Sequence, residues 1–128
     1  MKTAKTILIV EDEVPLLNVL RDKLTHEGFA ILTAEDGVEG LELALTKHPD
    51  LILLDINLPG MDGLTVLKHI NADAWGAKAK VIMLTNLNDY QSVAAALALG
   101  SKDFLVKSDW KIEELVKIVH ENLRTSFA

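Results

Sequence analysis

The sequence predicts a single α/β domain in which a parallel β-sheet carries helices on both faces. Short aliphatic runs alternate with longer stretches whose apolar residues recur every three or four positions. Gly, Pro or Asp punctuates most boundaries between them. This alternation continues through 128 residues, a length that suits one domain with one core. Regular alternation of strands and helices is typical of a parallel sheet covered on both sides.

The predicted strands are short apolar runs, most of which end at a polar side chain. They lie at residues 6–10, 30–34, 51–54, 81–84 and 104–106. The run Leu51–Leu54 consists of four large aliphatic residues, as expected for a strand buried on both faces, and it leads directly into Asp55. The run at 30–34 is less apolar and is expected at an edge of the sheet.

The predicted helices show one apolar face each. In the first, Pro15 suits the opening turn and Gly28 the end. Its apolar face consists of Val14, Leu17, Leu20 and Leu24. The other helices are expected around residues 38–45, 64–70, 89–99 and 112–123. Ser108 or Asp109 is expected to cap the last of them.

Composition excludes several classes of protein and of site. The net charge of −6 provides no positive surface for nucleic acid, and cysteine chemistry is absent. No apolar run approaches the roughly 18 residues of a membrane helix, and the polar N-terminus is unlike a signal peptide, so a cytoplasmic protein is expected. The histidines lack metal-ligand spacing and are expected at the surface: His26, His48, His69 and His120.

Charged and polar side chains follow four of the predicted strands. Glu11 and Asp12 follow the first strand, Asp55 the third, Thr85 the fourth and Lys107 the fifth. The carboxyl ends of parallel strands lie along one edge, where open α/β sheets bind ligands. Each residue alone also suits a helix cap or a solvated charge, but their predicted convergence favours a shared site.

The residue types at this edge favour phosphoryl chemistry. A cluster of carboxylates without Cys or His suits a hard cation such as Mg²⁺. A carboxylate such as Asp55 can also attack phosphorus and form an aspartyl phosphate. The cation, Thr85 and Lys107 would then neutralise the charge on the transferring group.

Four segments of the chain resemble the motifs of receiver domains of two-component response regulators. They are Ile9–Glu13, Leu53–Gly63, Val81–Thr85 and Asp103–Lys107. The resemblance extends over essentially the whole chain. It implies a single CheY-like receiver domain spanning 1–128, with no output domain within the sequence. Such a domain is expected to be either a stand-alone receiver or a fragment of a longer regulator. It also implies a flavodoxin-like (βα)5 three-layer sandwich with strand order 2-1-3-4-5.

The resemblance implies roles for Asp55, Asp12, Glu11 and Asn57. Asp55 would accept a phosphoryl group from a histidine kinase or histidine phosphotransfer protein. Asp12 would bind Mg²⁺ directly, Glu11 through water, and Asn57 through its backbone carbonyl, with Asp55 as a further ligand. The chain would then catalyse only its own phosphorylation and dephosphorylation.

The resemblance also implies how phosphorylation is sensed. Thr85 and Lys107 would contact the phosphoryl oxygens, and Thr85 with Phe104 would form the switch. The helix at 89–99, the strand carrying Phe104 and the final helix would bind a downstream effector or a second copy of the domain. Trp110, near the edge of that face, is a possible interface residue.

Two residues depart from the family's usual pattern. Ser108 stands where proline normally follows the lysine, so the Lys107–Ser108 peptide is expected to be trans, since a cis bond without proline costs about 2.5–4 kcal/mol. Asn86 stands where a small residue is usual, close to the expected phosphoryl group, which affects how long that group survives.

Two other functions compete with phosphorylation-dependent signalling. A phosphatase of the haloacid dehalogenase type also uses Mg²⁺ and an aspartate nucleophile, but Asn57 occupies the position of its general acid. A receiver-like interaction module that works without phosphorylation would not need the complete set of site residues.

Overall fold

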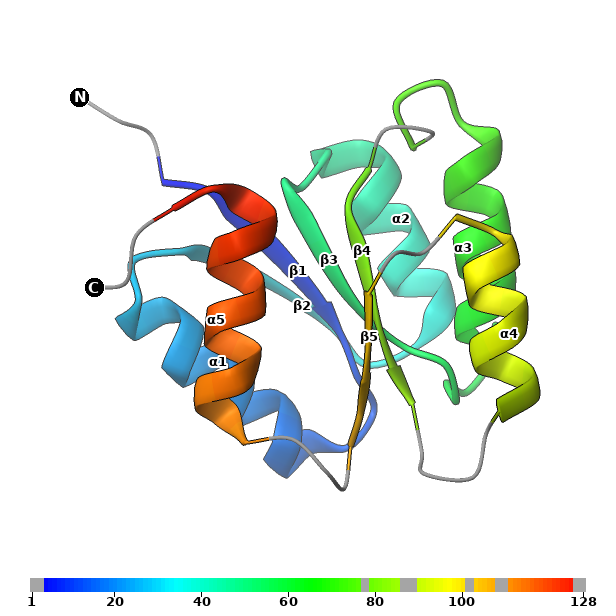
Figure 1. Cartoon of the computed structure of the whole chain (residues 1–128). Coiled ribbons are helices and arrows are strands. Elements are labelled where there is room, and N and C mark those ends of the chain that lie inside the picture. The colour runs from blue at the N-terminus through cyan, green and yellow to red at the C-terminus, as the bar shows by residue number, and fades with distance from the viewer. Residues whose placement is uncertain (1–3, 77–78, 86–89, 101–102, 108–110, 126–128) are drawn as a thin grey trace.

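The structure, a computed structural model, contains one five-stranded parallel sheet of order β2-β1-β3-β4-β5 (Figure 1). It describes residues 4–76, 79–85, 90–100, 103–107 and 111–125. The strands are β1 (Thr6–Val10), β2 (Ala30–Ala34), β3 (Leu51–Asp55), β4 (Val81–Thr85) and β5 (Asp103–Val106). All four neighbouring pairs are parallel, which confirms the predicted flavodoxin-like fold.

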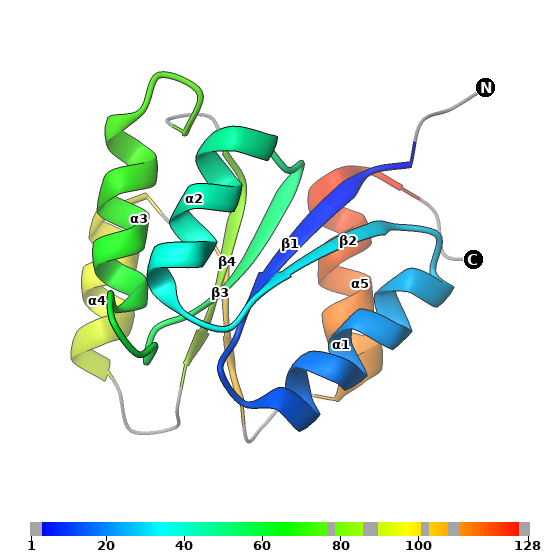
Figure 2. The ribbon, with the colours of Figure 1, turned by 180° about the vertical axis from the view of Figure 1, so that it is seen from behind.

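Helices cover both faces of the sheet, as Figures 1 and 2 show from opposite sides. One face carries α1 (Val14–His26) and α5 (Ile112–Leu123). The other carries α2 (Gly37–Lys47), α3 (Gly63–Ala72) and α4 (Tyr90–Ala98). Among the described residues, no helix combines the length and the apolar character needed to cross a bilayer.

The central strands bury side chains on both faces, which explains their continuous aliphatic sequences. Alternate side chains of a strand point to opposite faces of the sheet. In β3, Leu51 and Leu53 belong to the apolar layer that includes residues of α1 and α5, whereas Ile52 and Leu54 belong to the layer with α2 and α3. The edge strand β2 is mostly part-exposed, as its weaker sequence predicted.

Several local predictions are wrong. Val14 is 45% exposed instead of buried, because it is the first residue of α1. The N-cap position of α5 is Lys111, without a side-chain capping hydrogen bond, so neither Ser108 nor Asp109 stands at that position. These two residues, and with them the predicted trans peptide after Lys107, lie outside the described residues.

His120 is also buried, contrary to the prediction of a surface position. Its Nε2 lies 2.9 Å from Glu27 Oε1, and its Nδ1 lies 2.6 Å from Thr125 Oγ1. The ring also packs 5.1 Å, between centroids, from Phe29. A polar ring is tolerated in the interior because both nitrogens have partners. The other three histidines are exposed, as predicted.

Gly63, the first residue of α3, allows that helix to start directly against β3. Its N–H donates to Ile56 O at 2.8 Å. A Cβ at this position would lie 2.1 Å from Asp55 O and 2.8 Å from Ile56 Cα. Both are backbone atoms, which cannot move aside as the end of a side chain can.

Gly63→Ala is therefore expected to lower the free energy of unfolding by about 3 kcal/mol, at the upper end of overpacking costs. Gly28→Ala is the comparison, because its Cβ would meet nothing within 4 Å and only its positive φ of 97° opposes a side chain. That change should cost about 1–2 kcal/mol. Urea titration of both variants measures the difference, and equal losses would contradict the steric explanation.

Candidate functional site

The five residues predicted to converge do lie along one edge of the sheet. Asp55 and Thr85 are the last residues of β3 and β4. Glu11 and Asp12 directly follow β1, and Lys107 directly follows β5. Because every strand runs in the same direction, all these positions meet at the carboxyl edge.

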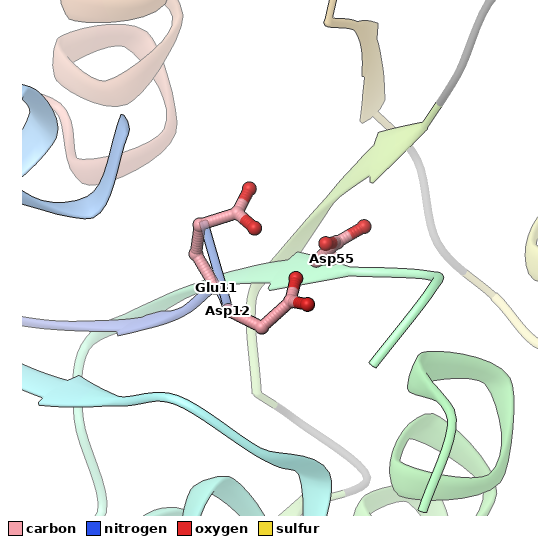
Figure 3. Close-up of side chains that lie close together, drawn as sticks. All are labelled: Glu11, Asp12 and Asp55. Carbon is pink, nitrogen blue, oxygen red and sulfur yellow. The ribbon is translucent and has the colours of Figure 1, made fainter. Parts of the chain in front are cut away.

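Three carboxylates form a compact cluster at this edge. Glu11, Asp12 and Asp55 each place one oxygen within 4.8 Å of the others (Figure 3). Glu11 and Asp55 are buried, whereas Asp12 is exposed. Glu11 Oε1 is a buried oxygen that accepts no hydrogen bond from the described residues. An all-oxygen set that includes buried carboxylate oxygens fits a hard divalent cation such as Mg²⁺.

The ammonium of Lys107 lies among the carboxylates. Its Nζ donates to Asp55 Oδ2 and to Glu13 Oε1, both at 2.9 Å. It also forms an ion pair with Glu11 Oε1 at 2.7 Å. Three carboxylates thus surround a group that has three N–H donors. One positive charge at this edge is therefore shared among several negative ones.

Burial and neighbouring charge shift two pKa values in the site. Burial raises the pKa of Glu11 to about 7, against the opposing contact with Lys107. Burial alone would lower the pKa of Lys107, but its carboxylate partners outweigh that effect and hold the pKa above its ordinary value. Lys107 is therefore charged at neutral pH, whereas burial favours the protonated form of Glu11 more than that of an ordinary glutamate.

Backbone N–H groups orient two of the carboxylates. Asn57 N donates to Asp55 Oδ1 at 3.1 Å, and Glu13 N donates to Glu11 Oε2 at 3.1 Å. In each case the donor is two residues after the acid, as in an Asx-type turn. Asp55 is therefore held from both sides, with Oδ1 on the backbone and Oδ2 on Lys107.

The remaining predicted residues lie beside this cluster or outside the described chain. Thr85 is fully buried, and its carbonyl accepts a 2.7 Å hydrogen bond from Lys107 N. Phe104, on β5, is 40% exposed and so is not a core residue. Asn86 and Trp110 lie outside the described residues.

Glu13 is the site residue that the sequence reasoning missed. Its carboxylate reaches Lys107 from the N-terminus of α1. The available signal was the third consecutive acid in Glu11–Glu13. Only two of the three acids were assigned a role, because spacing alone does not indicate where an exposed side chain at a helix start will turn.

Residues 7–120 match the family model of the response regulator receiver domain. The chain belongs to this family. Among curated proteins, this receiver domain is 36% identical over 107 residues to the "Probable transcriptional regulator ycf27" of Guillardia theta. The match covers 84% of the chain but only 41% of that relative, so the chain spans about two fifths of the relative's length.

Solved structures of receiver domains have the same fold. A CheY-like receiver domain protein from Methanospirillum hungatei JF-1 is 27% identical with a TM-score of 0.88, covering 95% of both chains. CheY4 of Vibrio cholerae is 27% identical, with a TM-score of 0.86, covering 94% of this chain and 99% of its own.

A further neighbour was solved with a metal ion. The receiver domain of the sensor histidine kinase PA1611 from Pseudomonas aeruginosa PAO1 is 28% identical, with a TM-score of 0.86, covering 96% of this chain and all of its own. A magnesium ion is coordinated in the active site cleft of that protein.

Proposed function

We propose that this receiver domain is a phosphorylation-dependent switch of a two-component phosphorelay, with Asp55 as the phosphoacceptor. The observation that supports this most directly is the setting of the Asp55 carboxylate. It is buried at the end of a central strand, 2.9 Å from the Lys107 ammonium and beside the carboxylates of Glu11 and Asp12. A nucleophile, a fixed cation and a set of metal ligands meet there.

The proposed reaction transfers a phosphoryl group from a phosphohistidine of a histidine kinase or phosphotransfer protein. One Asp55 oxygen forms a bond to phosphorus while the P–N bond breaks. The electron pair of the P–N bond stays on the imidazole nitrogen, and the imidazole takes a proton from solvent. Lys107 and the Thr85 hydroxyl neutralise the phosphoryl oxygens.

Mg²⁺ is the proposed cofactor. Asp12 would hold it directly, Glu11 through water, Asn57 through its carbonyl and Asp55 through a carboxylate oxygen. The ion would supply further positive charge where the phosphoryl oxygens gather. Within the receiver domain itself, Lys107 and the N–H of Asn57 orient the Asp55 carboxylate.

Incubation with acetyl phosphate and Mg²⁺ tests this function. Intact mass spectrometry should show one added phosphoryl group per chain, and a chelator should prevent it. If the domain binds its partners without ever being phosphorylated, it is an interaction module. Sustained turnover of p-nitrophenyl phosphate would instead indicate a phosphatase.

The proposed output surface is the face formed by α4, β5 and α5, for a downstream effector or a second copy of the domain. Two large apolar side chains are exposed on these elements, Leu97 on α4 and Phe104 on β5. With Thr85, Phe104 is the proposed switch residue. No nucleic acid or membrane contact is proposed for this chain, and a cytoplasmic location is expected from its partners.

Phe104→Ala is expected to weaken phosphorylation-dependent association at least severalfold, because it removes an exposed aromatic anchor. Val19→Ala is the matched control, since Val19 is an exposed apolar residue of α1, away from this face. Light scattering on each variant, with and without acetyl phosphate, measures association. An unchanged Phe104→Ala response would count against this surface.

A further inference from the structure

We propose that Glu13 positions Lys107 over Asp55 in the unphosphorylated domain, and that Lys107 releases Glu13 when Asp55 is phosphorylated. The inference rests on the proposed function, because it concerns the partner that Lys107 exchanges for a phosphoryl oxygen. Glu13 would then be a positioning residue that acts through Lys107 and touches neither the phosphoryl group nor the metal.

The side chain of Glu13 does not cap the helix that it begins. Glu13 occupies the N-cap position of α1, where a side-chain oxygen usually accepts from the second or third residue of the helix. The second residue is Pro15, which has no N–H. The Glu13 carboxylate makes no capping hydrogen bond and instead accepts from Lys107 Nζ at 2.9 Å. It therefore ties the start of α1 to the end of β5.

A phosphoryl oxygen on Asp55 has to find a donor on an ammonium that is already surrounded. The three partners of Lys107 differ in how well water can replace the lysine. The side chains of Glu11 and Asp55 are 0% and 2% exposed, whereas that of Glu13 is 61% exposed. Leaving a buried charge without its partner is costly, while an exposed carboxylate is resolvated at once. Glu13 is thus the carboxylate that loses its contact with Lys107 when a phosphoryl oxygen binds there.

The exchange makes Glu13 a competitor of the phosphoryl group. An exposed ion pair of this kind corresponds to roughly a two- to fivefold effect on an equilibrium. Glu13→Gln should therefore tighten the binding of beryllium fluoride, a phosphoryl mimic, by about two- to fivefold in the presence of Mg²⁺. The effect should fade at high salt, because salt screens exposed pairs.

Two further variants separate the contact from the net charge. Glu13→Asp keeps the charge but is one methylene shorter, so it should lose the contact and tighten binding as Glu13→Gln does. Glu35→Gln removes an equal charge from an exposed acid that follows β2 at the same edge, and should leave binding unchanged. Tightening in Glu35→Gln equal to that in Glu13→Gln would show a general charge effect and overturn the proposal.

The NMR signals of Lys107 distinguish the proposed exchange from a purely structural role of Glu13. In NMR spectra, Glu13→Gln should shift the Lys107 Cε and Hε signals of the unphosphorylated domain. Once beryllium fluoride and Mg²⁺ are bound, the same signals should coincide in the two proteins. A shift of equal size in both states would mean that Glu13 stays bound, and would overturn the proposal. If the unmodified domain binds no beryllium fluoride at all, the proposed function fails instead.

Discussion

Asp55→Asn is expected to abolish phosphorylation of the receiver domain completely. The amide is isosteric but carries no negative charge, so it is not a nucleophile toward phosphorus. It also removes one of the carboxylates that neutralise Lys107. Intact mass spectrometry after incubation with acetyl phosphate and Mg²⁺ should show one added group in the unmodified protein and none in the variant.

Asp36→Asn is the matched control for this substitution. Asp36 caps α2 by accepting from Glu39 N at 2.8 Å, and asparagine caps helices about as well as aspartate. This variant should therefore fold and be phosphorylated normally. Labelling of Asp55→Asn to the same extent as the control would refute the assignment of the phosphoacceptor.

The second large effect expected is stabilisation by Mg²⁺. The three clustered carboxylates repel one another, and Lys107 offsets this only in part. An ion that binds only the folded state at a hundredfold excess over its Kd adds about 2.7 kcal/mol to the free energy of unfolding. For a domain of this size that corresponds to a rise in Tm of about 10 °C.

Asp12→Asn should distinguish the effect of carboxylate repulsion on the Tm from the effect of Mg²⁺ binding. Loss of one negative charge should raise the Tm of the metal-free protein and weaken its response to Mg²⁺. Asp22→Asn is the control, because Asp22 is an exposed acid of α1 that pairs loosely with Arg21 at 3.6 Å. Differential scanning calorimetry with and without Mg²⁺ measures all three proteins. An unchanged Tm at millimolar Mg²⁺ would mean that the acidic cluster does not hold the ion.

Much of the fold was determined by features that are local in the sequence. Each aliphatic run specified a strand, and the run 51–54 also specified burial on both faces, because only a central strand hides consecutive side chains. The regular alternation of these runs with helices predicted that the strands are parallel. Parallel strands put their last residues on one edge, so the sequence predicts that Asp55, Thr85 and Lys107 lie together.

Other features depended on how separate elements pack. The apolar period of α1 predicted Val14 on the buried face, but the helix begins there and leaves it exposed. His120 could not be recognised as buried, because its partners Glu27 and Thr125 belong to the end of α1 and to the segment after α5. The spacing of apolar residues indicates which face of a helix points inward. It does not indicate which polar groups of other elements lie opposite that face.

The sheet, the edge where the charged residues meet and the kind of chemistry they permit thus follow from the sequence. The partners of Lys107, in contrast, depend on how distant elements pack together. Glu13 and Lys107 are 94 positions apart, and Glu13 is exposed, so neither spacing nor burial linked them in advance. The link arises in the fold, where the Glu13 carboxylate makes no capping hydrogen bond and the end of β5 brings the Lys107 ammonium within 2.9 Å of it.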